Sequence, residues 1–246
     1  LLAALSVEQK AKAIFPFSGG ARTDWHFVPK KDRKGLPLKE MTPEQTYLAH
    51  ILLNESLSQA GYSKTVGIMH LESILRDMDI ERGREGAVNY RDPTRYFISV
   101  FGTPQSSGAW GWSFEGHHVS INFTVLDGEL VASSPAFLGA NPHRIPGGPL
   151  ENVRVLGSEE DRARRLMVSL SEEQATSALI GAKVPGDIFS AALPRVSPGE
   201  PKGIKASSLS PGQVGLLHQL IDSYIENVTG SAAAERRAQV SAAGEE

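Results

Sequence analysis

Four segments of the chain carry the same helix-start motif, a Ser or Thr followed three residues later by a Gln. The Ser or Thr side chain can accept a hydrogen bond from a free backbone N–H of the new helix, and the Gln side chain can reach back to the first residue. The motif occurs as Ser6-Val7-Glu8-Gln9, Thr42-Pro43-Glu44-Gln45, Ser171-Glu172-Glu173-Gln174 and Ser210-Pro211-Gly212-Gln213. In two of them Pro takes the first helical position, where its missing N–H costs nothing. Any fold for this chain must therefore place four helices with defined starting points.

The four motifs form two pairs that recur along the chain. Leu5-Ser6 recurs as Leu170-Ser171, 165 residues later, and the segment 35–45 recurs as 203–213, 168 residues later. We interpret the recurrence as an internal duplication, with a first repeat over residues 1–157 and a partial second repeat over 158–230. The alternative is that well-capped amphipathic helices resemble one another by chance. Under the duplication, the counterpart of the strand near His118 falls at about position 286, beyond Glu246, so the second copy is expected to be truncated.

A β-rich block lies between the two pairs. Gly61 is expected to end the second helix, and the apolar stripe from Val66 to Met78 predicts a third helix over about 63–79. Strands are predicted over 95–101, 109–115, 117–126 and 129–138, with a hairpin turn at Asp127-Gly128. The predicted fold is α+β, with duplicated helical units packed with an antiparallel sheet. We expect a single domain over 1–230 and a polar tail over 231–246.

The composition excludes several classes of function. With a net charge of −3 and no strongly basic window, the chain lacks the positive surface that nucleic-acid binding requires. No apolar run reaches the roughly 18 residues of a membrane span. Because there is no Cys, disulfides and thiolate chemistry are excluded. Phosphate-binding loops, nucleophile elbows, zinc-protease helices and dinucleotide fingerprints are absent as well.

The segment from Trp110 to Thr124 is the strongest candidate for a site. Apolar and polar residues alternate along it, but the phase shifts by one residue at Glu115-Gly116. A shift at Gly predicts a bulge that places His117 and His118 on opposite faces. The polar residues expected to share one face are Glu115, His118, Ser120, Asn122 and Thr124. That face is either solvated, as in many antiparallel sheets, or lines a pocket in which His118 is a metal ligand or general base.

Two loops are candidates to fold over this face. One carries Arg22, Trp25 and His26, and the other carries Asn141 and His143. The predicted catalytic residues are Glu115 and His118, and the predicted metal ligands are His118 and His143. The predicted ligand-binding residues are Arg22, Trp25, His26, Trp112, Ser120, Asn122 and Asn141. In the absence of Cys, imidazole and oxygen donors suit a divalent ion, zinc or copper.

Several motifs resemble one known family. They are Arg22 to Pro29, Arg33 to Leu38, Phe101-Gly102-Thr103-Pro104, Trp110-Gly111-Trp112, Glu115 to Thr124 and Phe137 to Pro142. Together they resemble the family catalogued as domain of unknown function thirty-five hundred, over nearly the whole chain. The resemblance implies an exported, mostly bacterial protein, extracellular or periplasmic, without an established activity. It also implies a further His-rich stretch with an Asn-His-x-His pattern, which this chain lacks. A start at Leu1 rather than Met agrees with the removal of an upstream segment.

Three alternatives remain open at this point. The first is a metal-dependent enzyme, hydrolytic or oxidative, centred on His118. The second is a non-catalytic extracellular module that binds a small molecule, sugar or peptide on Trp25, Trp110 and Trp112. In either case the expected partner is a small molecule or peptide, with self-association or pairing with a missing C-terminal segment as a further expectation. If the missing copy carried the chemistry, this chain would be a purely structural or partner-binding fragment.

Overall fold

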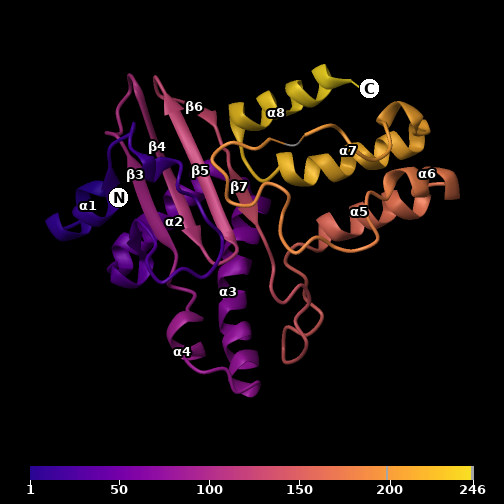
Figure 1. Cartoon of the computed structure of the whole chain (residues 1–246). Helices are drawn as coiled ribbons and strands as arrows, with labels where there is room; N and C mark the ends of the chain where they lie inside the picture. Colours follow the sequence, from indigo (N-terminus) through magenta and orange to yellow (C-terminus); the bar gives the residue numbers. More distant parts are fainter. Residues whose placement is uncertain (198, 245–246) are drawn as a thin grey trace. The chain divides into compact units, whose positions relative to one another are not determined.

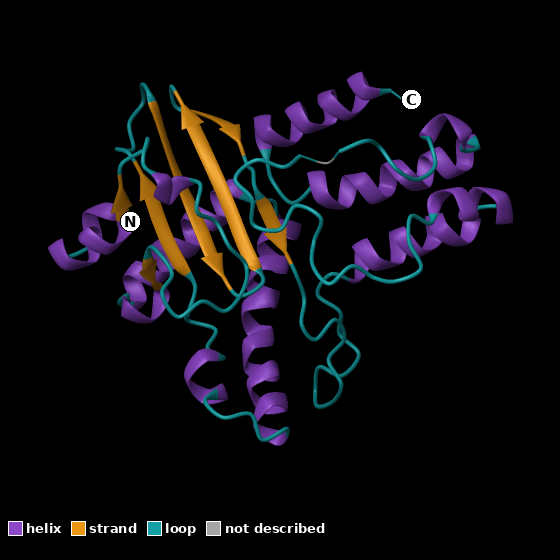
Figure 2. Ribbon diagram, viewed as in Figure 1, coloured by secondary structure: helices purple, strands orange, loops and turns teal. Residues whose placement is uncertain are grey.

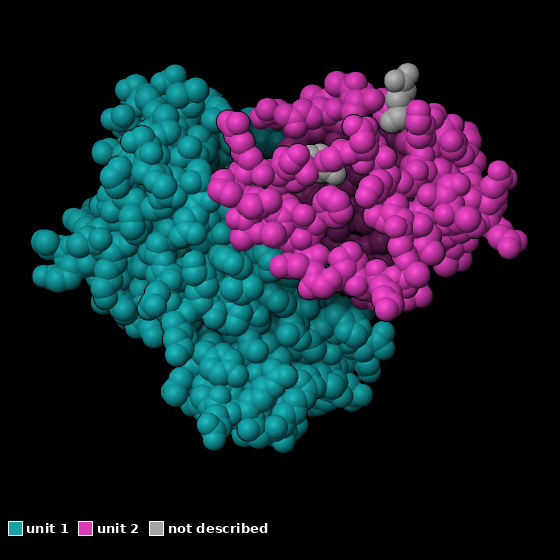
Figure 3. All heavy atoms as spheres, in the orientation of Figure 1, with its two compact units in different colours: residues 1–156, 227–232 teal, residues 157–226, 233–246 magenta. Residues whose placement is uncertain are grey.

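The computed structural model describes residues 1–197 and 199–244, which form two compact units (Figure 3). Unit 1 contains residues 1–156 and 227–232 and carries the sheet, whereas unit 2 contains the described residues of 157–226 and 233–246 and is helical. The unit boundary after Leu156 lies one residue from the predicted repeat boundary. The single domain over 1–230 stays a prediction.

Within the described residues, unit 1 is built around a seven-stranded sheet (Figures 1 and 2). Its main path runs β1-β3-β4-β5-β6, with β2 paired to β3 and β7 paired to β5. The strands are β1 (Ile14–Phe15), β2 (Leu36–Pro37), β3 (Phe97–Phe101), β4 (Ala109–Gly116), β5 (Val119–Leu126), β6 (Glu129–Ala132) and β7 (Ala136–Leu138). The pairing of β1 with β3 is parallel and the others are antiparallel, so the sheet is mixed rather than wholly antiparallel as predicted.

Helices complete both units and confirm the α+β class. Unit 1 has α1 (Val7–Ala13), α2 (Pro43–Ser56), α3 (Gln59–Glu81), α4 (Ala87–Tyr90) and the short 3-10 turns η1 (Leu2–Ala4), η2 (Gly20–Arg22) and η3 (Leu38–Glu40). Unit 2 has α5 (Gly157–Ser169), α6 (Glu172–Ala178), η4 (Ala206–Ser208), α7 (Pro211–Ile225) and most of α8 (Gly230–Ala243). The predicted polar tail is thus helical through Ala243, and its last two residues lie outside the described residues. No described helix has the length and hydrophobicity needed to cross a bilayer.

The four predicted capping boxes are all present. Each Ser or Thr side chain accepts a hydrogen bond from the backbone N–H of the Gln, whose own side chain accepts from the cap backbone N–H. These bonds satisfy donors that a helix start would otherwise leave free. Local sequence alone therefore determines where α1, α2, α6 and α7 begin.

Within each pair of boxes the two Gln side chains also bond to each other. In unit 1, Gln9 Nε2 donates to Gln45 Oε1 at 2.9 Å, and Gln45 Nε2 donates onward to the carbonyl of Ala4 at 2.7 Å. In unit 2, Gln174 Nε2 donates to Gln213 Oε1 at 3.1 Å, and Gln213 Nε2 donates to the carbonyl of Ser169 at 2.7 Å. The same arrangement occurs twice, at positions 165 and 168 residues apart.

Gly61 lies inside α3 rather than at the end of α2, which corrects the prediction. Ser58 caps the new helix by accepting from the Gly61 N–H at 3.0 Å. A Cβ on Gly61 would lie 2.0 Å from the carbonyl oxygen of Asn227, so glycine is needed where the 227–232 segment approaches the helix. Gly61 is therefore required by a close tertiary contact, which the tendency of glycine to end helices does not predict.

The phase shift in the 110–124 segment comes from a hairpin, so the predicted bulge is wrong. Strand β4 pairs regularly with β5, Glu115 opposite Ser120 and Gly116 opposite Val119, and His117-His118 form the two-residue turn between them. Cross-strand partners point to the same face of the sheet. Because Gly116 pairs with Val119, three residues later, the alternation of apolar and polar side chains shifts by one residue across the turn, as it would at a bulge. The two imidazole rings are 4.1 Å apart rather than on opposite faces.

Candidate functional site

The polar face of the sheet is buried rather than solvated. Cross-strand pairing places Glu115 with Ser120 and Ser113 with Asn122, and these four side chains are buried. The predicted set thus shares a face with the exception of His118, which sits in the turn. Ser113 Oγ and Asn122 Oδ1 have no hydrogen-bond partner in the described structure.

The segment 25–35 covers this face, so the loop that contains Trp25 is one of the two candidate loops that does so. The ring of Phe27 stacks on Phe137 of β7 with a centroid distance of 4.1 Å, and Phe27 O accepts from the His118 N–H at 2.7 Å. Gly35 lies against β3, where a Cβ would come within 2.6 Å of Ser99 Oγ. The covering segment thereby removes the polar face from water.

Glu115 is buried in an ion-pair triad with two cations of the covering segment. Its carboxylate accepts from Lys34 Nζ at 2.8 Å and from Arg33 Nη1 at 3.3 Å. Arg33 also donates to the carbonyls of His26 and Val28. Burial lowers the pKa of Arg33, and the nearby Glu115 carboxylate opposes that shift. Because its oxygens are committed to two cations, Glu115 anchors the covering segment and is not available as a free base.

His117 forms a pair with a carboxylate of helix α3. Its Nδ1 lies against Oε1 of Glu72, and Nη1 of Arg91 is 3.1 Å from the same nitrogen. A carboxylate only accepts, so we assign the proton of this contact to Nδ1 of His117. The Arg91 guanidinium, which only donates, then makes no hydrogen bond to Nδ1 and instead pairs with Oε2 of Glu72 at 4.0 Å. In the neutral ring Nε2 is then the acceptor, and the described residues offer it no partner.

Arg91 extends this pair into a buried network. Its Nε donates to Oδ2 of Asp79 at 2.9 Å, and Arg84 Nη1 lies 3.1 Å from the other oxygen of that carboxylate. The hydroxyl of Tyr96 donates to the backbone carbonyl of His117 at 2.8 Å. Burial raises the pKa of Tyr96 well above its usual value, so the phenol stays protonated and holds the turn in place. The network fixes the orientation of the His117 ring.

His118 is a second, differently placed imidazole. Its backbone has φ +60, an uncommon left-handed conformation that His, like Asn and Asp, adopts more often than most residues, and its carbonyl accepts from the Gly139 N–H at 2.8 Å. Its Nδ1 is buried without a partner. Burial first, and then the neighbouring His117, lower the pKa of His118 to about 4. The ring is therefore neutral near pH 7 and packs edge-on against Phe137.

A small indentation opens beside His117. It has room for about one water molecule, at about 10 Å³, and is lined by polar and charged side chains that include Lys30, Arg33, Glu72, Arg95 and His117. Its charged lining also includes Asp92, so three cations stand against two carboxylates, and Arg33 is already paired with Glu115. The indentation presents the imidazole beside Lys30 and Arg95.

Three of the other predicted ligand-binding residues have structural roles. Trp25 and Trp112 are buried, and the Trp112 ring stacks on Phe123 at 4.5 Å on the apolar face. His26 Nδ1 accepts from the backbone N–H groups of Phe27 and Val28. The two tryptophan rings pack in the core, and the His26 acceptor stabilises the covering loop, so these groups are already engaged in structural contacts.

The remaining predicted residues lie away from the histidine turn or contribute little to it. Arg22 donates to the carbonyl of Phe17 at 3.1 Å, and Asn122 Nδ2 donates to the carbonyl of Pro135 at 2.9 Å. Asn141 and His143 are exposed in the segment after β7. The part of the chain that the structure describes has no cluster of three or more His, Asp or Glu side chains placed to hold a metal ion. Zinc or copper binding at His118 and His143 stays a prediction.

Comparison with known proteins identifies the family. The model of a family described as "Protein of unknown function (DUF3500)" matches residues 1–246. The chain belongs to the DUF3500 family. No curated protein and no solved structure matches it. Membership confirms the resemblance read from the sequence motifs, and the chemistry of this DUF3500 chain has to be argued from its own site.

Sequence reasoning missed the carboxylates and arginine that surround His117. Glu72 and Asp79 are seven residues apart, so they lie on one face of α3, next to the buried Leu71 and Leu75. Charged residues inside an apolar stripe are a usable signal, because buried charges need partners. Their partner Arg91 directly follows the short helix α4, and no local sequence pattern indicates that its side chain packs against α3.

Proposed function

We propose that the DUF3500 chain binds a small anionic molecule at the opening of the indentation beside the β4–β5 turn, and that His117 exchanges a proton with it through the single water position that the indentation offers. The observation that supports this most directly is the pair formed by Glu72 and His117, next to the cation-lined indentation. A carboxylate that orients an imidazole through Nδ1 and leaves Nε2 unpartnered is the arrangement of many general bases. His117 therefore takes the role that the sequence alone favoured for His118.

The charges around the indentation favour an anion over a cation as the ligand. Lys30 and Arg95 line it, and Arg33 beside them is already paired with Glu115. Lys30 and Arg95 would repel a metal ion at Nε2 of His117, whereas a carboxylate or phosphate would gain charge-assisted hydrogen bonds from them. For this reason we rank the acid–base site above the metal-dependent enzyme. The tryptophan-based binding module has less support, because Trp25 and Trp112 are in the core.

Binding is tested by NMR of the histidine ring nitrogens during titration with inorganic phosphate and, separately, acetate. We expect a saturable change in the His117 signals. Arg95→Gln should weaken binding at least fivefold, because Arg95 lines the indentation. Arg76→Gln is the matched control, since this arginine pairs with the exposed Asp77 and does not line the indentation. If His117 shows no saturable change with either anion, the proposal is wrong.

Proton transfer is tested with pyruvate, an anion whose methyl protons exchange slowly with D2O. A general base at His117 should accelerate this exchange, and His117→Asn should reduce the acceleration by about 100-fold, the low end of what general base catalysis contributes. Glu72→Gln should reduce it less, because the ring remains but loses its orienting charge. Acceleration that survives His117→Asn would place the base elsewhere.

We also propose that the two pairs of capped helices are copies of one ancestral segment. The mutual Gln bonds and their onward bonds to Ala4 and Ser169 recur with the spacing found in the sequence. Chance resemblance between capping boxes would not reproduce hydrogen bonds between the boxes. Export from the cytoplasm is also a proposal, supported by the absence of Cys, and it is tested by fractionating cells that express the natural gene.

A further inference from the structure

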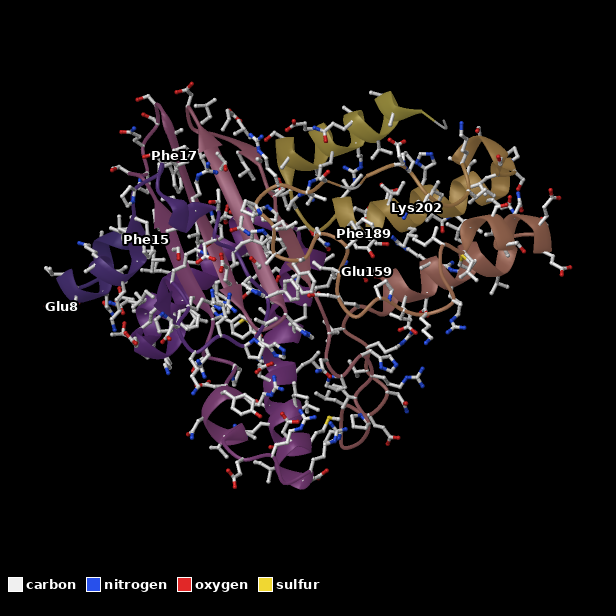
Figure 4. All side chains as sticks on the ribbon, in the orientation of Figure 1. Glu8, Phe15, Phe17, Glu159, Phe189 and Lys202 are labelled. Atoms are coloured by element: carbon white, nitrogen blue, oxygen red, sulfur yellow. The ribbon has the colours of Figure 1, made fainter. Side chains whose placement is uncertain are left out.

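The edge of β3 that faces away from β4 is covered in unit 1 by two short strands. Strand β1 pairs in parallel, Ile14 opposite Val100 and Phe15 opposite Phe101, and β2 pairs antiparallel, Leu36 opposite Ile98. Further backbone bonds extend the pairing, from Gly102 N–H to Phe15 O at 2.8 Å and from Leu38 N–H to Tyr96 O at 2.8 Å. Figure 4 labels Phe15 in this edge. Strands β1 and β2 thus act together as one receiving edge for β3.

Unit 2 contains the counterpart of this receiving edge. Leu179-Ile180 follow α6 as Ile14-Phe15 follow α1, and Ile204-Lys205 precede η4 as Leu36-Pro37 precede η3. The backbone conformations also match, with Lys205 at φ −70 and ψ 143 and Pro37 at φ −74 and ψ 146. Gly203 has φ +98 and its counterpart Gly35 has φ +101. We call Leu179-Ile180 together with Ile204-Lys205 the unit 2 edge.

Among the described residues, no strand takes the place of β3 at the unit 2 edge. A Cβ on Gly35 would lie 2.7 Å from the carbonyl oxygen of Ile98, whereas a Cβ on Gly203 would have its nearest neighbour, Ala178 O, at 3.6 Å. Leu36 is completely buried and Ile204 is only half-buried. Within the described residues, the N–H of Ala206, the counterpart of Leu38, forms no backbone hydrogen bond.

The unit 2 edge is open to solvent and apolar. Leu179 and Ile180 are 63% and 65% exposed. A groove of about 680 Å³ lies between α6 and the 203–213 segment, with Gly203 and Ile204 of the edge region in its mostly polar lining. Unpaired strand edges with exposed apolar side chains are templates for the addition of a further strand.

We propose that the unit 2 edge binds an extended strand of another polypeptide, with the chemistry of β3. The occupant is specified by the twin arrangement in unit 1, where the uncharged strand Phe97–Phe101 is seated on the corresponding edge. The bound strand runs parallel to Leu179-Ile180 and antiparallel to Ile204-Lys205. Main-chain bonds to both segments supply affinity, and aromatic or branched side chains bury Ile180 and Ile204. The inference is independent of the function proposed for the histidine turn.

The test uses the full chain and a fluorescently labelled peptide with the sequence of residues 94–102, extended by lysines for solubility. Fluorescence anisotropy should show saturable binding with one peptide per chain. Ile180→Asp should weaken binding at least tenfold, because it places a charge on the edge. Val184→Asp is the matched control, since Val184 is an apolar residue 94% exposed in the same loop but outside the unit 2 edge. This control should bind within twofold of the natural chain.

A second peptide tests whether the contact is a β-ladder. Proline in place of the residues that correspond to Ile98 and Val100 removes two backbone N–H groups and should abolish binding. Absence of saturable binding by the first peptide would overturn the proposal, as would equal binding by the proline peptide or by Ile180→Asp. A chain that dimerises through Ile180 and does not bind the peptide would make a second copy the occupant, which also overturns it. Circular dichroism of both variants should match the natural chain, since both residues are exposed.

Discussion

The two capped-helix modules of this chain share their local structure and differ in their burial. The first module is α1, η3 and α2, and the second is α6, η4 and α7. In both, paired Gln side chains bond to each other and to a backbone carbonyl 2.7 Å away. Ala13 is 1% exposed and lies in a cluster with Leu5 and Leu36, but its counterpart Ala178 is only half-buried. The comparison shows that local sequence forms the module and that the adjoining sheet buries it.

The largest difference between the modules is expected at their glycines. Gly35→Ala should cost about 3 kcal/mol, because it combines a left-handed backbone with overlap onto the β3 backbone. Gly203→Ala should cost about 1 kcal/mol, for the backbone alone. Urea unfolding measures both, with the three tryptophans, all in unit 1, as one reporter and Tyr224→Trp as the reporter for unit 2. Equal losses would contradict the open edge in unit 2.

A smaller difference is expected for the apolar residues that follow these glycines. Leu36→Ala removes a completely buried side chain and should cost about 2 to 3 kcal/mol. Ile204→Ala should cost about 1 kcal/mol, because Ile204 is only half-buried. The same unfolding measurement checks both variants. Addition of the 94–102 peptide should stabilise unit 2 and bring the loss of unfolding free energy in Ile204→Ala closer to the loss in Leu36→Ala.

The paired glutamines should show no difference at all. Gln45→Ala and Gln213→Ala each remove a buried amide that bonds to a Gln and to a backbone carbonyl. Each should cost about 2 kcal/mol, because the partners are left without their bonds. Values that agree within about 0.5 kcal/mol, a typical error for independent sites, would support the equivalence of the modules. A much smaller loss of stability in Gln213→Ala than in Gln45→Ala would mean that the two modules are alike in sequence but not in energetics.

The smallest effect is a dependence on pH confined to unit 1. His118 has a pKa of about 4 in the folded chain, mainly through burial, against about 6.5 when unfolded. Below pH 6.5 His118 binds a proton in the unfolded chain but not in the folded chain. The free energy of unfolding of unit 1 therefore falls as the pH is lowered from 6.5 to about 4. The loss should be about 1 kcal/mol, since partial exposure screens the effect.

His118→Asn should remove this part of the pH dependence, because Asn tolerates the left-handed backbone and does not titrate. Tryptophan-detected urea unfolding at several pH values measures it, and the Tyr224→Trp reporter serves as the control. An unchanged slope in His118→Asn would assign the pH dependence to other groups.

The candidate site was predicted in part. Alternation along β4 and β5 identified the polar face with Glu115, Ser120 and Asn122, because strand periodicity is a local property. Which imidazole gains a carboxylate was not predictable. His117 and Glu72 are 45 residues apart, and only the packing of α3 near the turn brings them together. Sequence reasoning placed His118 on the polar face because a one-residue phase shift does not distinguish a two-residue turn from a bulge.

The sequence by itself determined the four helix starts, the Asp127-Gly128 hairpin and the family. Those features depend on capping side chains, a two-residue turn and contiguous motifs, each of which acts within a few residues. Only the tertiary structure decided that the polar face is dry, that Gly61 accommodates Asn227 and that one receiving edge is paired while its twin is open. These features depend on contacts between distant segments, whose cost in chain entropy is recovered only when the whole unit packs.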